Sequence, residues 1–188
     1  AMGMHALLAV GQGSIHPPCL VTIKYNGAGA APYTAYVGKG ITFDSGGISI
    51  KPSDNMGEMK DDMAGAGAVL GALRAIAALK IPCNVMGIIA CAENMPSGSA
   101  QRPGDVVKAA NGKTIEVIST DAEGRMVLAD AVWYACKQGA AKVVDIATLT
   151  GGVIVALGTE TAGVVGNDDV LIRQLIEAGK KAGESYWQ

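Results

Sequence analysis

The sequence predicts an α/β fold in three layers, in which helices flank a mixed, largely parallel β-sheet. Short apolar segments alternate with longer segments of helical periodicity, which is the order of elements typical of such a sheet. Asn84 opens a segment that stays apolar through Ala90, as expected for a strand buried on both faces. Pro82 and Gly139 follow two of the helical segments and mark the ends of those helices.

The individual elements follow from these patterns. Helices are predicted over 63–79, 125–138 and 170–182, where apolar residues recur at helical spacing. The segment 93–112 contains prolines, glycines and serines and is predicted to be a long loop, a feature that is often functional in a compact domain. Strands are predicted over 5–10, 20–25, 35–41, 83–91, 115–118, 142–147 and 162–165.

The composition limits the class of protein. With 188 residues, of which 49% are hydrophobic and 17% charged, the chain is predicted to form one soluble globular domain. Its net charge of -2 offers no basic surface for nucleic acid or for an anionic membrane. The four cysteines show no CxxC spacing, which favours free thiols in a reducing compartment. We therefore predict a cytoplasmic protein, without a signal peptide or a membrane span.

Three segments place charged residues among apolar or glycine-rich sequence. The first contains Lys39, Asp44 and Lys51, the second contains Asp62, and the third is STDAEGR at 119–125. A buried charge needs a partner, because otherwise it loses its hydration without compensation or changes its protonation. We therefore expect these charged side chains to have partners and to take part in a functional site.

The acidic residues suit a site for two metal ions. Asp44, Asp62, Asp121 and Glu123 supply hard oxygen donors, and carboxylates shared between two cations are a common basis of such sites. Both histidines lie outside the acidic segments, so imidazole does not supply a nitrogen ligand. Lys39 could supply it instead, because a neutral amine can bind a cation. Taken alone, however, a lysine is more often a surface charge or the partner of a carboxylate.

Structural explanations also exist for these residues. Asp121 and Glu123 could cap the helix predicted to begin at Arg125, because the helix dipole stabilises acids there. Lys51 and Arg125 could be ordinary ion-pair partners of the acids. The glycines of 65–71 resemble a dinucleotide-binding fingerprint, but they follow acidic residues instead of an apolar strand. We predict that they let a helix pack closely against the metal-binding loops.

Five motifs follow one another between Leu7 and Asn167, namely GKGITFDSGGISIK, MKDDMAGA, ENMPSGSAQRPGDVV, STDAEGRMVLADA and DIATLTGG. With them the chain resembles the leucyl aminopeptidase family, the cytosol aminopeptidases, which are metallopeptidases with two metal ions. Ser119 departs from the family, which usually has Asn there. The resemblance implies a zinc-exopeptidase-like fold, with residues 1–188 as part of the C-terminal catalytic domain. The family's N-terminal domain and the C-terminal end of the catalytic domain would then be absent from this sequence.

The resemblance also implies which residues bind the two ions. A tight site would be held by Lys39, Asp44, Asp62 and Glu123. A looser site would be held by Asp44, Glu123 and Asp121, including the backbone carbonyl of Asp121, so that Asp44 and Glu123 bridge the ions. Zn²⁺ and Mn²⁺ are the first candidates for both sites, with Co²⁺ and Mg²⁺ as further ones.

Catalytic roles are implied for Lys51 and Arg125. Lys51 would stay protonated and donate to the oxyanion of the tetrahedral intermediate. Arg125 would hold a bicarbonate ion that acts as general base toward a metal-bridging water. The implied reaction is hydrolysis of the first peptide bond of peptides that have a free N-terminal residue.

Substrate contacts are implied as well. Met59, Thr148 and Gly151 match positions that line the pocket for the first side chain, which would favour Leu or Met, and Leu149 matches a backbone contact to the substrate. Met59 and Thr148 taken alone are more often core residues than specificity determinants. Members of the family form homo-hexamers, and the same is implied here, without nucleic acid or a membrane as partner of this segment. The alternative is an inactive fragment or an interaction module that retains the site.

Overall fold

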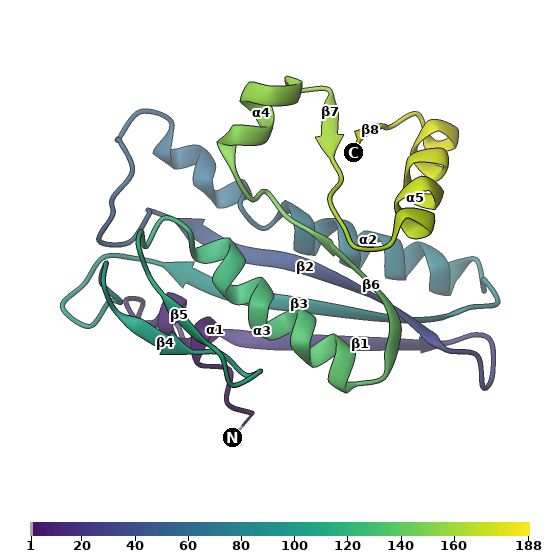
Figure 1. Ribbon diagram of the computed structural model, residues 1–188, viewed down its shortest axis with the longest axis horizontal. Helices are drawn as coiled ribbons and strands as arrows, with labels where there is room; N and C mark the ends of the chain where they lie inside the picture. The colour runs from purple at the N-terminus through teal and green to yellow at the C-terminus, as the bar shows by residue number, and fades with distance from the viewer. Residues whose placement is uncertain (1) are drawn as a thin grey trace. The chain divides into compact units, whose positions relative to one another are not determined.

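The sheet at the centre of the first part of the chain has four strands in the order β1-β3-β2-β6 (Figure 1). β1 (Cys19–Asn26) is antiparallel to β3 (Asn84–Asn94), whereas β2 (Tyr33–Asp44) is parallel both to β3 and to β6 (Ala140–Ile146). The predicted mixed, largely parallel sheet is confirmed. The computed structural model describes residues 2–188, which divide into a first unit that ends at Thr148 and a second unit that begins at Leu149.

β3 is buried on both faces of the sheet, as its uninterrupted apolar sequence predicts. Met86, Ile88 and Ala90 belong to the hydrophobic core on one face. Val85 and Ile89 belong to the core on the other face, because successive side chains of a strand point in opposite directions. Both faces of the sheet therefore need a covering layer.

Helices supply a layer on each face, which completes the predicted three-layer α/β fold (Figure 1). α1 (His5–Gly11) and α3 (Glu123–Lys137) pack on one face, and α2 (Ala64–Ala78) packs on the other. The helices predicted over 63–79 and 125–138 are thereby confirmed as α2 and α3.

The prediction of a strand over 5–10 is wrong, because these residues form α1. The segment is short and apolar, and such a run does not distinguish a strand from a buried helix. Its alanines and leucines favour a helix, and only one residue is β-branched. The backbone N–H of Leu7 donates to Asp130 of α3 at 3.0 Å, so a tertiary contact satisfies one of the free amides of the first helical turn.

The predicted long loop over 93–112 is only partly correct. β3 continues to Asn94, and β4 (Val106–Lys108) lies within the segment and pairs antiparallel with β5 (Thr114–Glu116). A 3₁₀ helix, η1 (Met56–Asp61), precedes α2 and was not predicted. A loop joins Asn94 to Val106, and it starts where β3 ends beside β2.

Of the three glycines in α2, only Gly65 packs closely, and it packs against the sheet, so the prediction that these glycines pack against the metal-binding loops is wrong. A Cβ atom on Gly65 would lie 2.0 Å from the carbonyl oxygen of Ile146 in β6. A Cβ atom on Gly38 of β2 would lie 2.6 Å from the Cα of Ala66. Glycine at both positions lets the start of α2 approach β2 and β6 directly.

The second unit is a small α/β arrangement. Its parallel strands β7 (Thr161–Gly163) and β8 (Ser185–Trp187) pair with each other, and the predicted helix over 170–182 is confirmed as α5 (Asp169–Ala182). A carboxylate oxygen of Asp168 accepts from the backbone N–H groups of Val170 and Leu171, both at 3.0 Å, and caps α5. No helix among residues 2–188 is both long and apolar enough to span a bilayer. The unit also contains α4 (Gly151–Leu157).

Candidate metal centre

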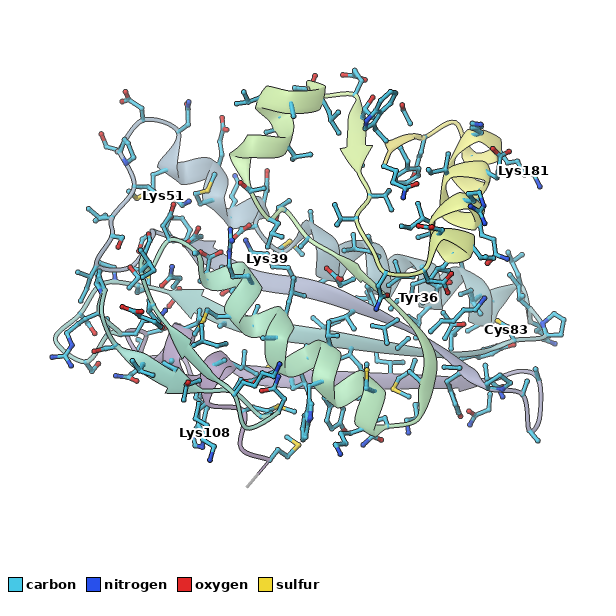
Figure 2. The ribbon with its side chains drawn as sticks, in the orientation of Figure 1. Tyr36, Lys39, Lys51, Cys83, Lys108 and Lys181 are labelled. Atoms are coloured by element: carbon cyan, nitrogen blue, oxygen red, sulfur yellow. The ribbon has the colours of Figure 1, made fainter. Side chains whose placement is uncertain are left out.

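Lys39 is the buried cation at the centre of the site. It lies on β2 with 2% of its surface exposed, and Figure 2 shows its side chain beside the first turns of α3. Its Nζ atom lies 2.7 Å from Oδ1 of Asp62 and 2.8 Å from Oε1 of Glu123. Nζ also donates to the backbone carbonyl of Thr148 at 2.8 Å. A Cβ atom on Gly124 would lie 2.9 Å from Nζ, so a larger residue at this position would displace the end of the Lys39 side chain.

Two carboxylate oxygens at this site are left without a partner. Oδ2 of Asp62 and Oε2 of Glu123 are buried and accept no hydrogen bond from any residue that the structure describes. Burial raises the pKa of Asp62. Burial is also the main cause that raises the pKa of Glu123 to about 7, with the charge of Asp44 adding to it and the charge of Lys39 opposing it. A buried acceptor without a donor is costly, and a bound cation would relieve that cost.

Lys51 pairs with two further carboxylates. Its Nζ lies 2.9 Å from Oδ2 of Asp44 and 2.7 Å from Oδ1 of Asp121. Burial tends to lower the pKa of Lys51, but the hydrogen bonds and charges of Asp121 and Asp44 outweigh burial and raise this pKa above its ordinary value. Lys51 is therefore protonated at neutral pH, and it remains partly open, with 23% of its side chain exposed.

The acidic residues meet as the sequence predicts. One carboxylate oxygen each from Asp44, Asp121 and Glu123 lie within 4.8 Å of one another, close enough to bind one cation. Lys39 joins Glu123 to Asp62 and thereby connects the fourth acid to this group. The group holds four carboxylates against two lysines, and this excess of negative charge fits divalent cations.

Neither Asp121 nor Glu123 forms a side-chain cap, although Glu123 lies in the first turn of α3, where the helix dipole favours an acid. The N-cap residue of α3 is Ala122, and no side-chain cap hydrogen bond forms there. Asp121 pairs with Lys51, and Glu123 pairs with Lys39. The ion-pair explanation fits Lys51, but Arg125 is exposed and its side chain makes no hydrogen bond or ion pair within residues 2–188.

The residues predicted to contact substrate are divided between the two units. Met59 is half-buried in η1, and Thr148 donates from Oγ1 to Oδ1 of Asp62 at 2.7 Å. Leu149 and Gly151 belong to the second unit, where Leu149 is exposed and Gly151 begins α4. Thr148 therefore contacts one of the carboxylates of the site. Met59 lies in η1, a few residues before Asp62 along the chain.

Sequence reasoning missed Asn94 and Thr120, which are both buried among the candidate ligands. Nδ2 of Asn94 donates to Oδ1 of Asp44 at 2.8 Å and to the carbonyl of Thr120 at 3.0 Å. Asn94 lies in the motif ENMPSGSAQRPGDVV, and Thr120 lies in the motif STDAEGRMVLADA. Asn94 is also a polar residue at the end of a buried strand. That position was a usable signal, because a buried amide needs partners for its donors.

The fold and the site define an α/β protein with a buried lysine and four carboxylates arranged as a candidate centre for divalent cations. The chain belongs to the cytosol aminopeptidase family, whose catalytic-domain sequence profile matches residues 1–188. It is 56% identical over 189 residues to a "Probable cytosol aminopeptidase" of Azotobacter vinelandii, and the aligned part covers 100% of this chain. It is 54% identical to a "Cytosol aminopeptidase" of Pseudomonas aeruginosa, again over 100% of this chain.

A solved structure shares the fold. The chain superposes on the "Bottromycin maturation enzyme BotP" with a TM-score of 0.92 and 46% sequence identity, over 99% of this chain and 40% of that one. The chain spans 38% of the length of the two curated relatives. It therefore corresponds to part of the proteins that it resembles.

Proposed function

We propose that this chain carries the catalytic centre of a metallo-aminopeptidase that hydrolyses the first peptide bond of peptides with a free N-terminus. The observation that supports this most directly is the contact of Lys39 with Asp62 and Glu123, beside carboxylate oxygens that have no partner. Such a buried group of acids is expensive for a purely structural purpose. It is suited to a protein that binds divalent cations.

The chain's own residues divide into two ligand sets. Asp44, Asp62, Glu123 and Lys39, the last as a neutral amine that has lost its proton, would hold a first ion, and Asp44, Asp121 and Glu123 a second, with Zn²⁺ or Mn²⁺ preferred and Co²⁺ or Mg²⁺ as further candidates. When bound, the ions would polarise the scissile carbonyl and make a water molecule more acidic. The excess of carboxylates over lysines and the short separation within the acidic group support this assignment.

Lys51 would stabilise the negative charge that develops on the carbonyl oxygen of the substrate. Its raised pKa keeps the ammonium group charged, and its partial exposure leaves a donor hydrogen accessible to a substrate. A cation that is already held in place costs no reorganisation during the reaction. Asp44 and Asp121 hold Lys51 in this position through their carboxylates.

Arg125 would hold the bicarbonate ion that the family resemblance implies as general base. A guanidinium group binds a planar oxyanion through paired hydrogen bonds. Arg125 is exposed on the first turn of α3, two residues after Glu123, and no residue in the described part of the chain occupies its donors. Its chemistry and its availability both fit an anion.

Recognition of the substrate would start at its free amino group. Oδ2 of Asp62 is a buried acceptor without a partner, and it is suited to an ammonium or amine group close to the ions. Met59 would line an apolar pocket for Leu or Met together with Thr148 and Gly151, while the backbone of Leu149 would bind the substrate. We propose a homo-hexamer as the functional assembly of the whole protein, by analogy with the family.

Hydrolysis of leucine p-nitroanilide by the metal-stripped chain, before and after addition of Mn²⁺ or Zn²⁺, tests this proposal. We expect metal-dependent release that is lost in Glu123→Ala and absent with the N-acetylated substrate. Lys51→Met should still bind the cation but turn over far more slowly. Binding of the cation without release by the wild-type chain would mean that this segment keeps the site as an inactive fragment or interaction module.

A further inference from the structure

Two separate loops carry the candidate ligands and have to be held together. One loop follows β2 and runs from Asp44 to Lys51, and the other precedes α3 and contains Asp121. We propose that Asn94 and Thr120 are positioning residues that fix these loops relative to each other for cation binding. The proposal rests on the proposed function, because it concerns the same ions.

Asn94 connects the two loops directly. It ends β3, is 1% exposed, and uses its amide nitrogen twice, toward Oδ1 of Asp44 at 2.8 Å and toward the carbonyl of Thr120 at 3.0 Å. An amide nitrogen has two hydrogens, so both donors are engaged. The backbone carbonyl of Asn94 also accepts two hydrogen bonds from Ser45, one from its backbone N–H at 3.0 Å and one from the Ser45 hydroxyl at 2.7 Å.

Thr120 closes the connection from the other side. Its side chain is fully buried, and Oγ1 donates to the carbonyl of Gly46 at 2.6 Å while accepting from the backbone N–H of Ser49 at 2.8 Å. In return, the backbone N–H of Thr120 donates to Oγ of Ser49 at 3.1 Å. Thr120 and Ser49 thus form a reciprocal pair between the two loops.

The first loop passes close to both residues. Gly47 has a φ of 69°, which favours glycine, and a Cβ atom there would lie 2.9 Å from Oδ1 of Asn94 and 2.9 Å from Oγ1 of Thr120. No other residue type would let the turn approach the two side chains this closely. The turn and the two positioning residues therefore form one packed polar unit.

The network controls the orientation of the ligands. Oδ1 of Asp44 accepts from Asn94 and from the backbone N–H of Gly46 at 3.0 Å, which leaves Oδ2 facing Lys51. Thr120 directly precedes Asp121, so its two anchors fix the peptide that leads to Asp121 and Glu123. Hydrogen bonds to ligands from outside the coordination shell typically change metal affinity about 10- to 100-fold when they are removed.

A matched pair at Thr120 tests the proposal, with Mn²⁺ alone as the probe. Mn²⁺ is titrated into the metal-stripped chain by calorimetry, and circular dichroism with thermal unfolding monitors the fold. We expect Thr120→Val, which replaces the hydroxyl by a methyl group of similar size, to raise the Kd for Mn²⁺ about 10- to 100-fold. Thr120→Ser, which keeps the hydroxyl, should stay within about threefold of the wild-type chain, a smaller change than loss of such a bond produces.

Three further variants extend the test. Asn94→Leu should weaken Mn²⁺ binding as much as Thr120→Val does. Ser49→Ala removes one acceptor at the half-buried end of the network and should weaken Mn²⁺ binding less. Ser49→Ala keeps the proposal testable if a variant at a fully buried position does not fold. Thr42→Val is the control, because its hydroxyl bonds only to the carbonyl of Ala92, at 3.3 Å. We expect Thr42→Val to bind like the wild-type chain.

The outcomes separate this inference from the proposed function. If the wild-type chain binds Mn²⁺ and the variants Thr120→Val, Asn94→Leu and Ser49→Ala bind it equally well, the positioning role is refuted and the metal centre stands. If Thr120→Ser is as weak as Thr120→Val, the methyl group and not the hydroxyl is responsible, and the inference is again wrong. If the wild-type chain binds no divalent cation, the proposed function fails, and the positioning role fails with it.

Discussion

The Nζ atom of Lys39 lies 2.8 Å from Oε1 of Glu123, and both side chains are almost completely buried. The two residues come from the middle of β2 and from the first turn of α3, so the sheet and the start of a helix meet at this ion pair. A buried ion pair is weak evidence for a stabilising role, because desolvation offsets the attraction. The unpaired Oε2 of the same glutamate supports the proposed cation site.

The pKa of Glu123 gives a prediction for the metal-stripped chain. Burial and the charge of Asp44 raise this pKa to about 7 from 4.5, against the charge of Lys39. Between these values the folded chain keeps a proton that the unfolded chain has lost, so the free energy of unfolding should fall as pH rises. The slope is at most about 1.4 kcal/mol per pH unit for one group.

Urea unfolding of the chelator-treated chain at pH 5, 6, 7 and 8 measures this slope. Glu123→Gln, which cannot ionise, is the matched control and should flatten the profile between pH 5 and 7. A wild-type profile that rises with pH over this window, or one that Glu123→Gln leaves unchanged, would show that another group controls the pH dependence.

The sequence predicted the sheet, the main helices and the charged site for identifiable reasons. β3 was predictable because a strand buried on both faces must be apolar throughout, and α2 and α3 because their apolar residues recur at helical spacing. Asp44, Asp62 and Glu123 were recognisable as site residues because an acid among apolar residues is buried and needs a partner for its charge. The structure confirms that they lie together, while their role as metal ligands stays a prediction.

Other features depended on contacts between distant parts of the chain. The sequence of α1 also fits a strand, because a short apolar run is ambiguous, and the contact of Leu7 with Asp130 joins residues that are 123 positions apart. Asn94 and Thr120 were missed because their importance lies in hydrogen bonds across two loops. Local patterns carry no information about such partners.

Asp130 should be a large contributor to stability. It is fully buried in α3, and its two oxygens accept from the backbone N–H groups of Leu7 at 3.0 Å and of Ala110 at 2.8 Å. Asp130→Ala leaves the buried donor of Leu7 and the half-buried donor of Ala110 unpaired, at a cost of about 1–3 kcal/mol for a buried one and less for the other. Asp130→Asn keeps one acceptor and should cost about half as much. Urea unfolding measures both, with the exposed Glu116→Gln as control, and equal stability of all the variants would refute the role.

Two glycines of α2 should respond to alanine in opposite directions. Gly71 lies inside the helix, and a Cβ atom there would have nothing within 4 Å, so Gly71→Ala should raise the free energy of unfolding by about 0.5–1 kcal/mol through better helix propensity. At Gly65 the same methyl group would lie 2.0 Å from the carbonyl oxygen of Ile146. This oxygen is a backbone atom of β6, so it cannot rotate away as a side chain could. Gly65→Ala should therefore lower stability by about 1–3 kcal/mol or more.

Thermal and urea unfolding of the two variants, side by side with the wild-type chain, test this pair. Because both substitutions add the same methyl group to the same helix, the difference between them removes the common gain in helix propensity and leaves the cost of the contact with β6. Gly65→Ala must also push α2 away from Lys39, whose backbone N lies 3.1 Å from the added Cβ, so its affinity for Mn²⁺ should fall while that of Gly71→Ala stays unchanged. If Gly65→Ala is as stable as Gly71→Ala, then α2 can shift along the sheet without loss, and the close approach is not needed for the fold.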